Sequence, residues 1–119
     1  MIEELHIRLL SASTSVAQIE LGGFLNLDTS ETLYDTIHDI LSANAPKSLI
    51  FYVSNVKYVS SAGVGVFMSL YEQIEANGGK IAFVGLSDSF RRVLNLLGFH
   101  QYFGDCTDEQ AALGYCSAA

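Results

Sequence analysis

The stretch that decides the fold runs from Lys57 to Leu70 and reads KYVSSAGVGVFMSL. An apolar run that is typical of a strand ends there at two adjacent serines, Ser60 and Ser61, and a helix-like run begins. From residue 61 to residue 77 the apolar side chains recur at helical spacing, and two glycines then end the pattern. The stretch therefore predicts a turn that leads from a strand directly into a helix.

Upstream of this turn, the sequence predicts a hairpin, a helix and a buried strand. Residues 5–10 and 16–21 partly alternate apolar and polar side chains around a serine-rich turn, which is typical of two antiparallel strands. Asp28 and Glu31 resemble a capping box, and apolar side chains follow at helical spacing up to Ala43. Residues 48–53 (SLIFYV) form a nearly continuous apolar run, the pattern of a strand covered on both faces.

Downstream of the turn, the sequence predicts a strand, a helix, a short extended segment and a last helix. Residues 81–84 (IAFV) have the pattern of a short buried strand. Ser87 can cap a helix that Gly98 is placed to stop. An extended segment over residues 100–103 leads to Thr107 and Gln110, a second capping-box pair, before a small C-terminal helix.

This order of elements predicts an α/β fold in a single domain over residues 1–119. Strands that alternate with crossover helices imply a central, mostly parallel sheet, which is opened here by an antiparallel hairpin and carries about four helices. The loops after the carboxyl ends of parallel strands gather on one edge of the sheet. We therefore expect the turn at Ser60 and Ser61 to lie beside the turn GGFLNLDTS of residues 22–30.

Composition and charge limit the classes of function. The net charge is −7, and no basic residues cluster apart from Arg91 and Arg92, which argues against nucleic acid as a partner. The spacing of Cys106 and Cys116 fits neither a zinc site nor a disulfide framework, so we expect reduced thiols, no metal and no cofactor. The sequence has no secretory signal and no apolar run of about 18 residues, and we expect a cytoplasmic protein without membrane insertion.

The paired serines admit three roles, as a helix cap, a nucleophile or a site of modification. A capping serine accepts a hydrogen bond from a backbone N–H and stabilises the helix by about 1 kcal/mol. A nucleotide-binding P-loop would need a Lys-Ser/Thr pair where Val66 and Phe67 stand, and V-S-S-A-G lacks the G-x-S-x-G pattern of a hydrolase. The three histidines lie in separate predicted elements, which does not favour a catalytic triad. An exposed serine at a helix start can also accept a phosphate, whose charge the helix dipole favours.

Two glycines in the first helical turn, Gly63 and Gly65, require an explanation of their own. Each costs up to about 1 kcal/mol relative to alanine inside a helix. Glycine at these positions allows another backbone segment, or an anion, to approach the helix N-terminus.

Taken together, these motifs resemble those of the STAS domain, in particular the stand-alone bacterial anti-sigma factor antagonists. That family carries a strand, a D/S-S-S/T/A-G-L turn, a helix, a G-G-x-apolar strand and a third helix that ends in L-x-x-x-G-apolar. The matching positions here are Ser60-Ser61-Ala62-Gly63-Val64, Gly78-Gly79-Lys80-Ile81, and Leu94 to Gly98 followed by Phe99. The G-x-L-x-L turn of residues 23–27 and the first hairpin also fit, so the resemblance covers essentially the whole chain.

The resemblance implies a regulator in a partner-switching pathway with no enzyme activity of its own. In this family the unphosphorylated antagonist binds an anti-sigma factor that is also a serine kinase of the histidine-kinase-like ATPase type. The kinase phosphorylates the turn serine, which releases the antagonist, and a PPM-type serine phosphatase restores it. The matched phosphorylation site is Ser61. The residues expected around it and in contact with the partner are Ser60, Ala62, Gly63, Val64, Gly65, Phe24, Leu25, Asn26 and Leu27.

Departures from the family pattern leave other functions open. Many members have Asp directly before the phosphorylated serine, where this chain has Ser60, and a G-E-apolar-D turn, where this chain has Phe24 and Asn26. Some STAS proteins are never phosphorylated and act as scaffolds or as accessory subunits of transport complexes. A small-ligand or anion-binding protein that uses the SSAGVG turn is a further alternative. Phe24, Leu25 and Leu27 either pack into the core or form a contact patch.

Overall fold

The computed structural model describes residues 4–118, and one mixed sheet joins the strands of this part of the chain. The strands are β1 (Leu5–Ala12), β2 (Val16–Leu25), β3 (Ser48–Val59), β4 (Ile81–Val84) and β5 (Gly104–Cys106). The helices are α1 (Leu27–Asn44), α2 (Ser61–Ala76), α3 (Asp88–Leu96) and α4 (Glu109–Ser117), with a 3₁₀ turn, η1, over His100–Tyr102. Within residues 4–118 no helix is long and apolar enough to span a lipid bilayer.

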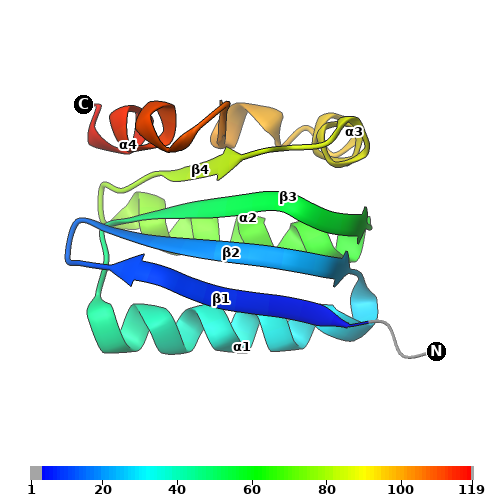
Figure 1. Ribbon diagram of the computed structural model, residues 1–119, viewed down its shortest axis with the longest axis horizontal. Coiled ribbons are helices and arrows are strands. Elements are labelled where there is room, and N and C mark those ends of the chain that lie inside the picture. Colours follow the sequence, from blue (N-terminus) through cyan, green and yellow to red (C-terminus); the bar gives the residue numbers. More distant parts are fainter. Residues whose placement is uncertain (1–3, 119) are drawn as a thin grey trace.

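The spatial order of the strands follows their order in the chain, β1-β2-β3-β4-β5, and β1 to β4 lie side by side in Figure 1. β1 and β2 pair antiparallel, and the other neighbours pair parallel. Right-handed crossovers between strands in this order place α1, α2 and α3 on one face of the sheet. α4 follows the last strand and packs on the opposite face. The predicted α/β fold with a mostly parallel sheet is confirmed.

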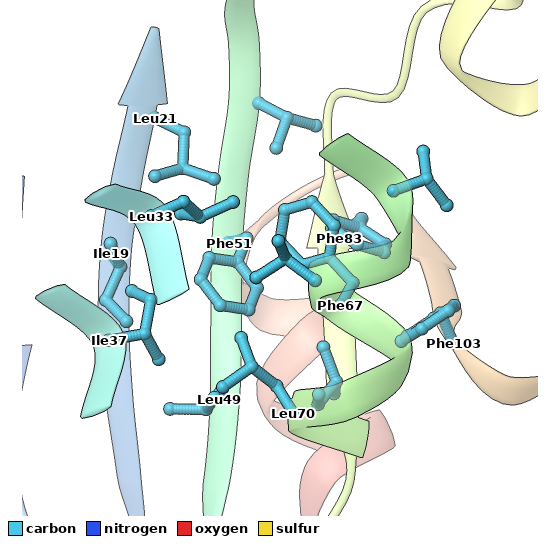
Figure 2. Packing of buried hydrophobic residues seen from close by; sticks show 14 of the residues in the cluster. Ile19, Leu21, Leu33, Ile37, Leu49, Phe51, Phe67, Leu70, Phe83 and Phe103 are labelled. Carbon is cyan, nitrogen blue, oxygen red and sulfur yellow. The ribbon is translucent and has the colours of Figure 1, made fainter. Parts of the chain in front are cut away.

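The main core lies between the sheet and helices α1, α2 and α3, and its centre is a group of aromatic rings. The ring centroid of Phe67 on α2 lies 5.1 Å from that of Phe51 on β3 and 5.0 Å from that of Phe83 on β4. Both pairs meet edge to face, a geometry that aromatic rings prefer, and Figure 2 shows the three rings together. Leu33 and Ile37 of α1 complete the layer over β2. This packing fixes α2 on the sheet.

β2 extends further toward the carboxyl edge than the sequence pattern predicts, and β3 continues past the apolar run of residues 48–53 up to the two serines. β2 includes residues 22–25, which were expected to belong to a turn, and β3 continues to Val59. Residues 22–25 of β2 pair with residues 55–59 of β3. The register of this pairing shifts twice, after Glu20 and after Gly23. The strict alternation of side chains is lost at such bulges, which is why the pattern ended too early.

Both predicted capping boxes are wrong. The N-cap of α1 is Asn26, whose Oδ1 accepts from the Thr29 N–H at 3.1 Å, while the Thr29 Oγ1 accepts from the Asn26 N–H at 3.0 Å. The pair is therefore Asn26 and Thr29 instead of Asp28 and Glu31. α4 is capped by Asp108 instead of Thr107, through a 2.8 Å bond from the Ala111 N–H. Asn and Asp are at least as good N-caps as Thr, and the chain uses them.

The region between α3 and α4 differs from the expectation in one element. Ser87 caps α3 by accepting from the Phe90 N–H at 3.1 Å, and Gly98 follows the helix with a φ of 73°, so both helix signals are confirmed. Residues 100–102, expected to be extended, form η1. The short strand lies just beyond, over Gly104–Cys106, where it pairs with β4.

Candidate functional site at the carboxyl edge of the sheet

Two helices begin next to each other at the carboxyl edge. α1 starts after β2, and α2 starts after β3, its neighbour in the sheet. The Ser60 N–H donates a hydrogen bond of 2.8 Å to the Leu25 carbonyl, which ties the end of β2 to the start of α2. The predicted juxtaposition of the turn at residues 60–61 with the segment that precedes α1 is therefore confirmed.

The two serines have different positions at the start of α2. Ser60 is the half-buried N-cap, and its hydroxyl accepts from the Gly63 N–H at 3.4 Å. Ser61 is the first helical residue and is exposed, and within residues 4–118 its hydroxyl makes no hydrogen bond. Ser60 therefore provides the cap, and the exposed Ser61 hydroxyl is not needed for it.

Gly63 is required by a close approach of backbone. A Cβ at this position would lie only 2.6 Å from the Leu25 carbonyl oxygen and 2.9 Å from the Leu25 Cβ. Of the two explanations offered by the sequence, the approach of another backbone segment is thus confirmed for Gly63. A Cβ at Gly65 would meet nothing within 4 Å, so packing gives no reason for that glycine.

The apolar residues of the neighbouring turn divide between the core and the surface. Leu25 is fully buried, whereas Leu27 is 74% exposed at the start of α1. The half-buried Phe24 ring lies 6.3 Å from the ring of Tyr58, which is 51% exposed. We refer to Phe24, Leu27 and Tyr58 as the edge patch. Tyr58 was missed by the sequence analysis, although it stands opposite Phe24 in the register of β2 and β3.

Most of the remaining predicted site residues lie beneath the surface of the carboxyl edge. Asn26, Gly63 and Val64 are buried, as a cap, a contact point and a core residue respectively. Ala62 and Gly65 are half-buried. Of the predicted group, Leu27 and Ser61 are the exposed members.

None of the described residues forms a hydrogen bond that would activate the Ser61 hydroxyl as a nucleophile. Within residues 4–118 no histidine is hydrogen-bonded to Ser60 or Ser61, and the imidazole of His38 instead contacts Gln73 at 3.0 Å between α1 and α2.

Burial raises the pKa of the Cys116 thiol to about 11, so this thiol stays protonated and weakly reactive near neutral pH. No group of three His, Cys, Asp or Glu side chains in the described part of the chain could hold a metal ion.

Comparison with known proteins agrees with this architecture. The family model of the STAS domain matches residues 10–112. This chain belongs to the STAS domain family. Among relatives of this STAS domain is the anti-sigma F factor antagonist of Lysinibacillus sphaericus, 23% identical over 107 residues that make up 90% of this chain and 92% of the relative.

Solved structures show the same fold. An anti-sigma factor antagonist from Mycobacterium paratuberculosis superposes with a TM-score of 0.82 at 19% identity, over 97% of this chain and 96% of the other. Unphosphorylated SpoIIAA, an anti-sigma factor antagonist, gives a TM-score of 0.76 at 23% identity, covering 89% and 92%. The Bacillus cell fate determinant SpoIIAA in its phosphorylated form gives 0.70 at 22%, covering 92% and 99%. The STAS fold is thus shared, and SpoIIAA is a member that exists in both states of phosphorylation.

Proposed function

We propose that this protein, as a single STAS domain over residues 1–119, is an anti-sigma factor antagonist that is switched by phosphorylation of Ser61. The observation that carries the proposal is the exposed hydroxyl of Ser61 on the first residue of α2, which forms no hydrogen bond with residues 4–118 and stands beside an N-cap supplied by Ser60. The anti-sigma F factor antagonist of Lysinibacillus sphaericus and the two forms of SpoIIAA support it. Its partners are an anti-sigma factor that is a serine kinase of the histidine-kinase-like ATPase type and a PPM-type phosphatase.

A phosphate on Ser61 is compatible with the fold because it stands at a helix N-terminus. The first backbone N–H groups of α2 and the helix dipole favour negative charge there. The same group lies on the edge that carries Leu27, and a docked protein would have to remove water from both. Phosphorylation then weakens the complex without unfolding the antagonist. This chain contributes the acceptor hydroxyl, and the kinase contributes the base, the metal and the nucleotide.

Phosphorylation of Ser61 is tested with the cognate kinase, identified by affinity capture on the unmodified protein. Incubation with this kinase and ATP is expected to add one phosphate to the wild type and none to Ser61→Ala, as measured by mass spectrometry. Ser60→Ala is the matched control, because it removes the cap at a cost of about 1 kcal/mol but keeps the acceptor. Undiminished labelling of Ser61→Ala would show that Ser61 is not the phosphorylated residue. Capture of no kinase would favour a scaffold without a phosphorylation cycle.

We expect Ser61→Asp to weaken kinase binding while leaving the free energy of unfolding nearly unchanged. A carboxylate in the first turn of a helix contributes about 0.3–1 kcal/mol in the stabilising direction. Calorimetric titration with the kinase and thermal unfolding measure the two quantities. Ser69→Asp is the control for added charge, because Ser69 is exposed on the same helix two turns away. A melting temperature lowered by several degrees in Ser61→Asp would show that the Ser61 hydroxyl is structural.

We expect Leu27→Ser to lower the affinity for the kinase by roughly tenfold or more, since exposed apolar anchors carry much of the energy of protein interfaces. Its effect on the free energy of unfolding is expected to stay within about 0.5 kcal/mol, because the side chain is 74% exposed. Leu96→Ser on α3 provides a matched control, since Leu96 is 80% exposed. If Leu27→Ser and Leu96→Ser bind the kinase with equal affinity, Leu27 is not part of the interface.

A further inference from the structure

A single buried hydroxyl, that of Thr29, joins the start of α1 to the end of β2. Thr29 is the third residue of α1 and is only 7% exposed. Its Oγ1 donates a hydrogen bond of 2.8 Å to the Phe24 carbonyl and accepts one of 3.0 Å from the Asn26 N–H. The two other acceptors near this hydroxyl, the side-chain and backbone oxygens of Asn26, lie further away at 3.3 and 3.4 Å. Because a hydroxyl has one hydrogen to donate, the short bond to Phe24 is its principal donation.

The same hydroxyl is connected to the start of α2 through one peptide group. The carbonyl of Leu25 and the N–H of Asn26 belong to the same planar unit. Its N–H donates to the Thr29 Oγ1, and its carbonyl accepts from the Ser60 N–H at 2.8 Å. Because the unit is rigid, a rotation that follows loss of the bond at the N–H also moves the carbonyl.

These bonds form one continuous chain across the carboxyl edge. Hydrogens are donated in one direction along it, from Ser60 to Leu25, from Asn26 to Thr29 and from Thr29 to Phe24. The peptide group and the hydroxyl in the middle each donate and accept at once, so the bonds polarise and strengthen one another. Removal of one member therefore weakens the others.

The position of the Leu25 carbonyl is sensitive to this chain of bonds. A Cβ at Gly63 would lie 2.6 Å from the carbonyl oxygen, so α2 already packs closely against it. The register of β2 and β3 shifts directly before this segment, after Gly23, and Leu25 stands in the last pair of the ladder. Since a bulge interrupts regular pairing, the ladder alone holds this end of β2 weakly. The Thr29 hydroxyl supplies the additional restraint.

We infer that Thr29 is a positioning residue for the phosphorylation of Ser61. This inference rests on the proposed function and adds to it a buried residue that acts on the acceptor through the backbone. The Thr29 hydroxyl fixes the peptide that holds the Ser60 N–H, and the Ser61 hydroxyl stands on the next residue. Transfer of a phosphoryl group depends on an aligned acceptor, and a misplacement of about 1 Å can cost roughly 100-fold in rate.

The inference is tested by the kinetics with which the cognate kinase phosphorylates variants of the full chain, at a temperature at which every variant is folded. Thr29→Val removes the hydroxyl at nearly constant shape and keeps the backbone N–H that Asn26 caps. We expect its kcat to fall roughly tenfold and its KM to stay within about threefold, because Leu27 remains exposed for docking. Thr29→Ser keeps the hydroxyl and should restore kcat to within about twofold of wild type.

Ser48→Ala is the matched control for loss of a buried hydroxyl. Ser48 is 2% exposed, its Oγ accepts from the Lys80 N–H at 3.0 Å, and it stands at the opposite end of β3 from Ser60. This variant should lose stability and keep kcat within about twofold of wild type. Hydrogen exchange of the Ser60 amide gives a second measurement, and it should accelerate more in Thr29→Val than in Ser48→Ala.

The outcomes separate this inference from the proposed function. If Ser61→Ala is not labelled while Thr29→Val keeps the kcat of wild type, Thr29 does not position the acceptor and the proposed function stands. An equal loss of kcat in Ser48→Ala, or a loss in Thr29→Val that is confined to KM, overturns the inference as well. If the kinase does not label the wild type, both fall. Should Thr29→Val fail to fold, Thr29→Ala removes the same hydroxyl without placing a methyl group against the Phe24 carbonyl.

Discussion

Replacing Gly63 by alanine is expected to destabilise the protein by roughly 1–3 kcal/mol, although alanine is the better helix former. The new methyl group would lie 2.6 Å from the Leu25 carbonyl oxygen, well inside normal contact, and that atom is backbone and cannot turn away. The start of α2 has to move, which strains the bond between the Ser60 N–H and Leu25. Urea unfolding measures the loss of stability, and we expect slower labelling of Ser61 by the kinase because the acceptor is displaced.

Gly65→Ala is the control for this substitution. It lies two residues further along the same helix, and its methyl group would meet nothing within 4 Å. It should stabilise the protein by about 0.5–1 kcal/mol through helix propensity alone. Equal effects of the two substitutions would mean that the contact with Leu25 does not constrain the edge.

Replacing Phe67 by alanine is expected to cost about 3–5 kcal/mol, a large part of the total stability of a small domain. The ring is fully buried between Phe51 and Phe83 and lies 6.1 Å from that of Phe90. Its removal leaves a cavity at the point where α2 is held against the sheet, so we expect the melting temperature to fall steeply. Phe67→Leu keeps most of the volume and should cost less than about 2 kcal/mol. A loss below about 1 kcal/mol for Phe67→Ala would show that the core collapses to fill the space.

The sequence predicted the parts of the fold in which burial leaves a periodic pattern. The helix over residues 61–77 and the strand over residues 81–84 match α2 and β4 closely. α2 packs one apolar face on the main core, and β4 is buried on both faces, with Ile81 and Phe83 in the main core and Ala82 and Val84 in the cluster under α4. The start of α1 was misplaced because several residues there can serve as a cap. Asn26 takes that role because Thr29 is anchored twice, by the capping box and by donation to the Phe24 carbonyl at 2.8 Å. The bond from Thr29 to the Phe24 carbonyl depends on where β2 ends, and the pattern of apolar and polar residues does not show that end.

The sequence predicted which two segments meet at the carboxyl edge, and the contacts between them depend on tertiary structure. The sequence indicated that Ser60 or Ser61 caps the helix and that a backbone segment could approach Gly63. It could not identify the Leu25 carbonyl as that segment, because this depends on the pairing of β2 with β3. Leu25 and Leu27 were grouped as apolar neighbours, yet one is in the core and the other on the surface, since the chain changes from strand to helix between them.

The sequential order of the strands also explains what kind of recognition this edge can support. In sheets whose strand order reverses, helices leave two adjacent strands toward opposite faces, and a crevice for small ligands opens at that topological switch point. Here the helices after β2 and β3 both turn to the same face, and the bond from Ser60 to Leu25 closes the gap between them. The carboxyl edge is therefore a continuous platform on which Leu27 and Ser61 stand exposed. Under the proposed function, a partner would contact this platform over an area, and the two negative charges of a phosphate on Ser61 would prevent the fit.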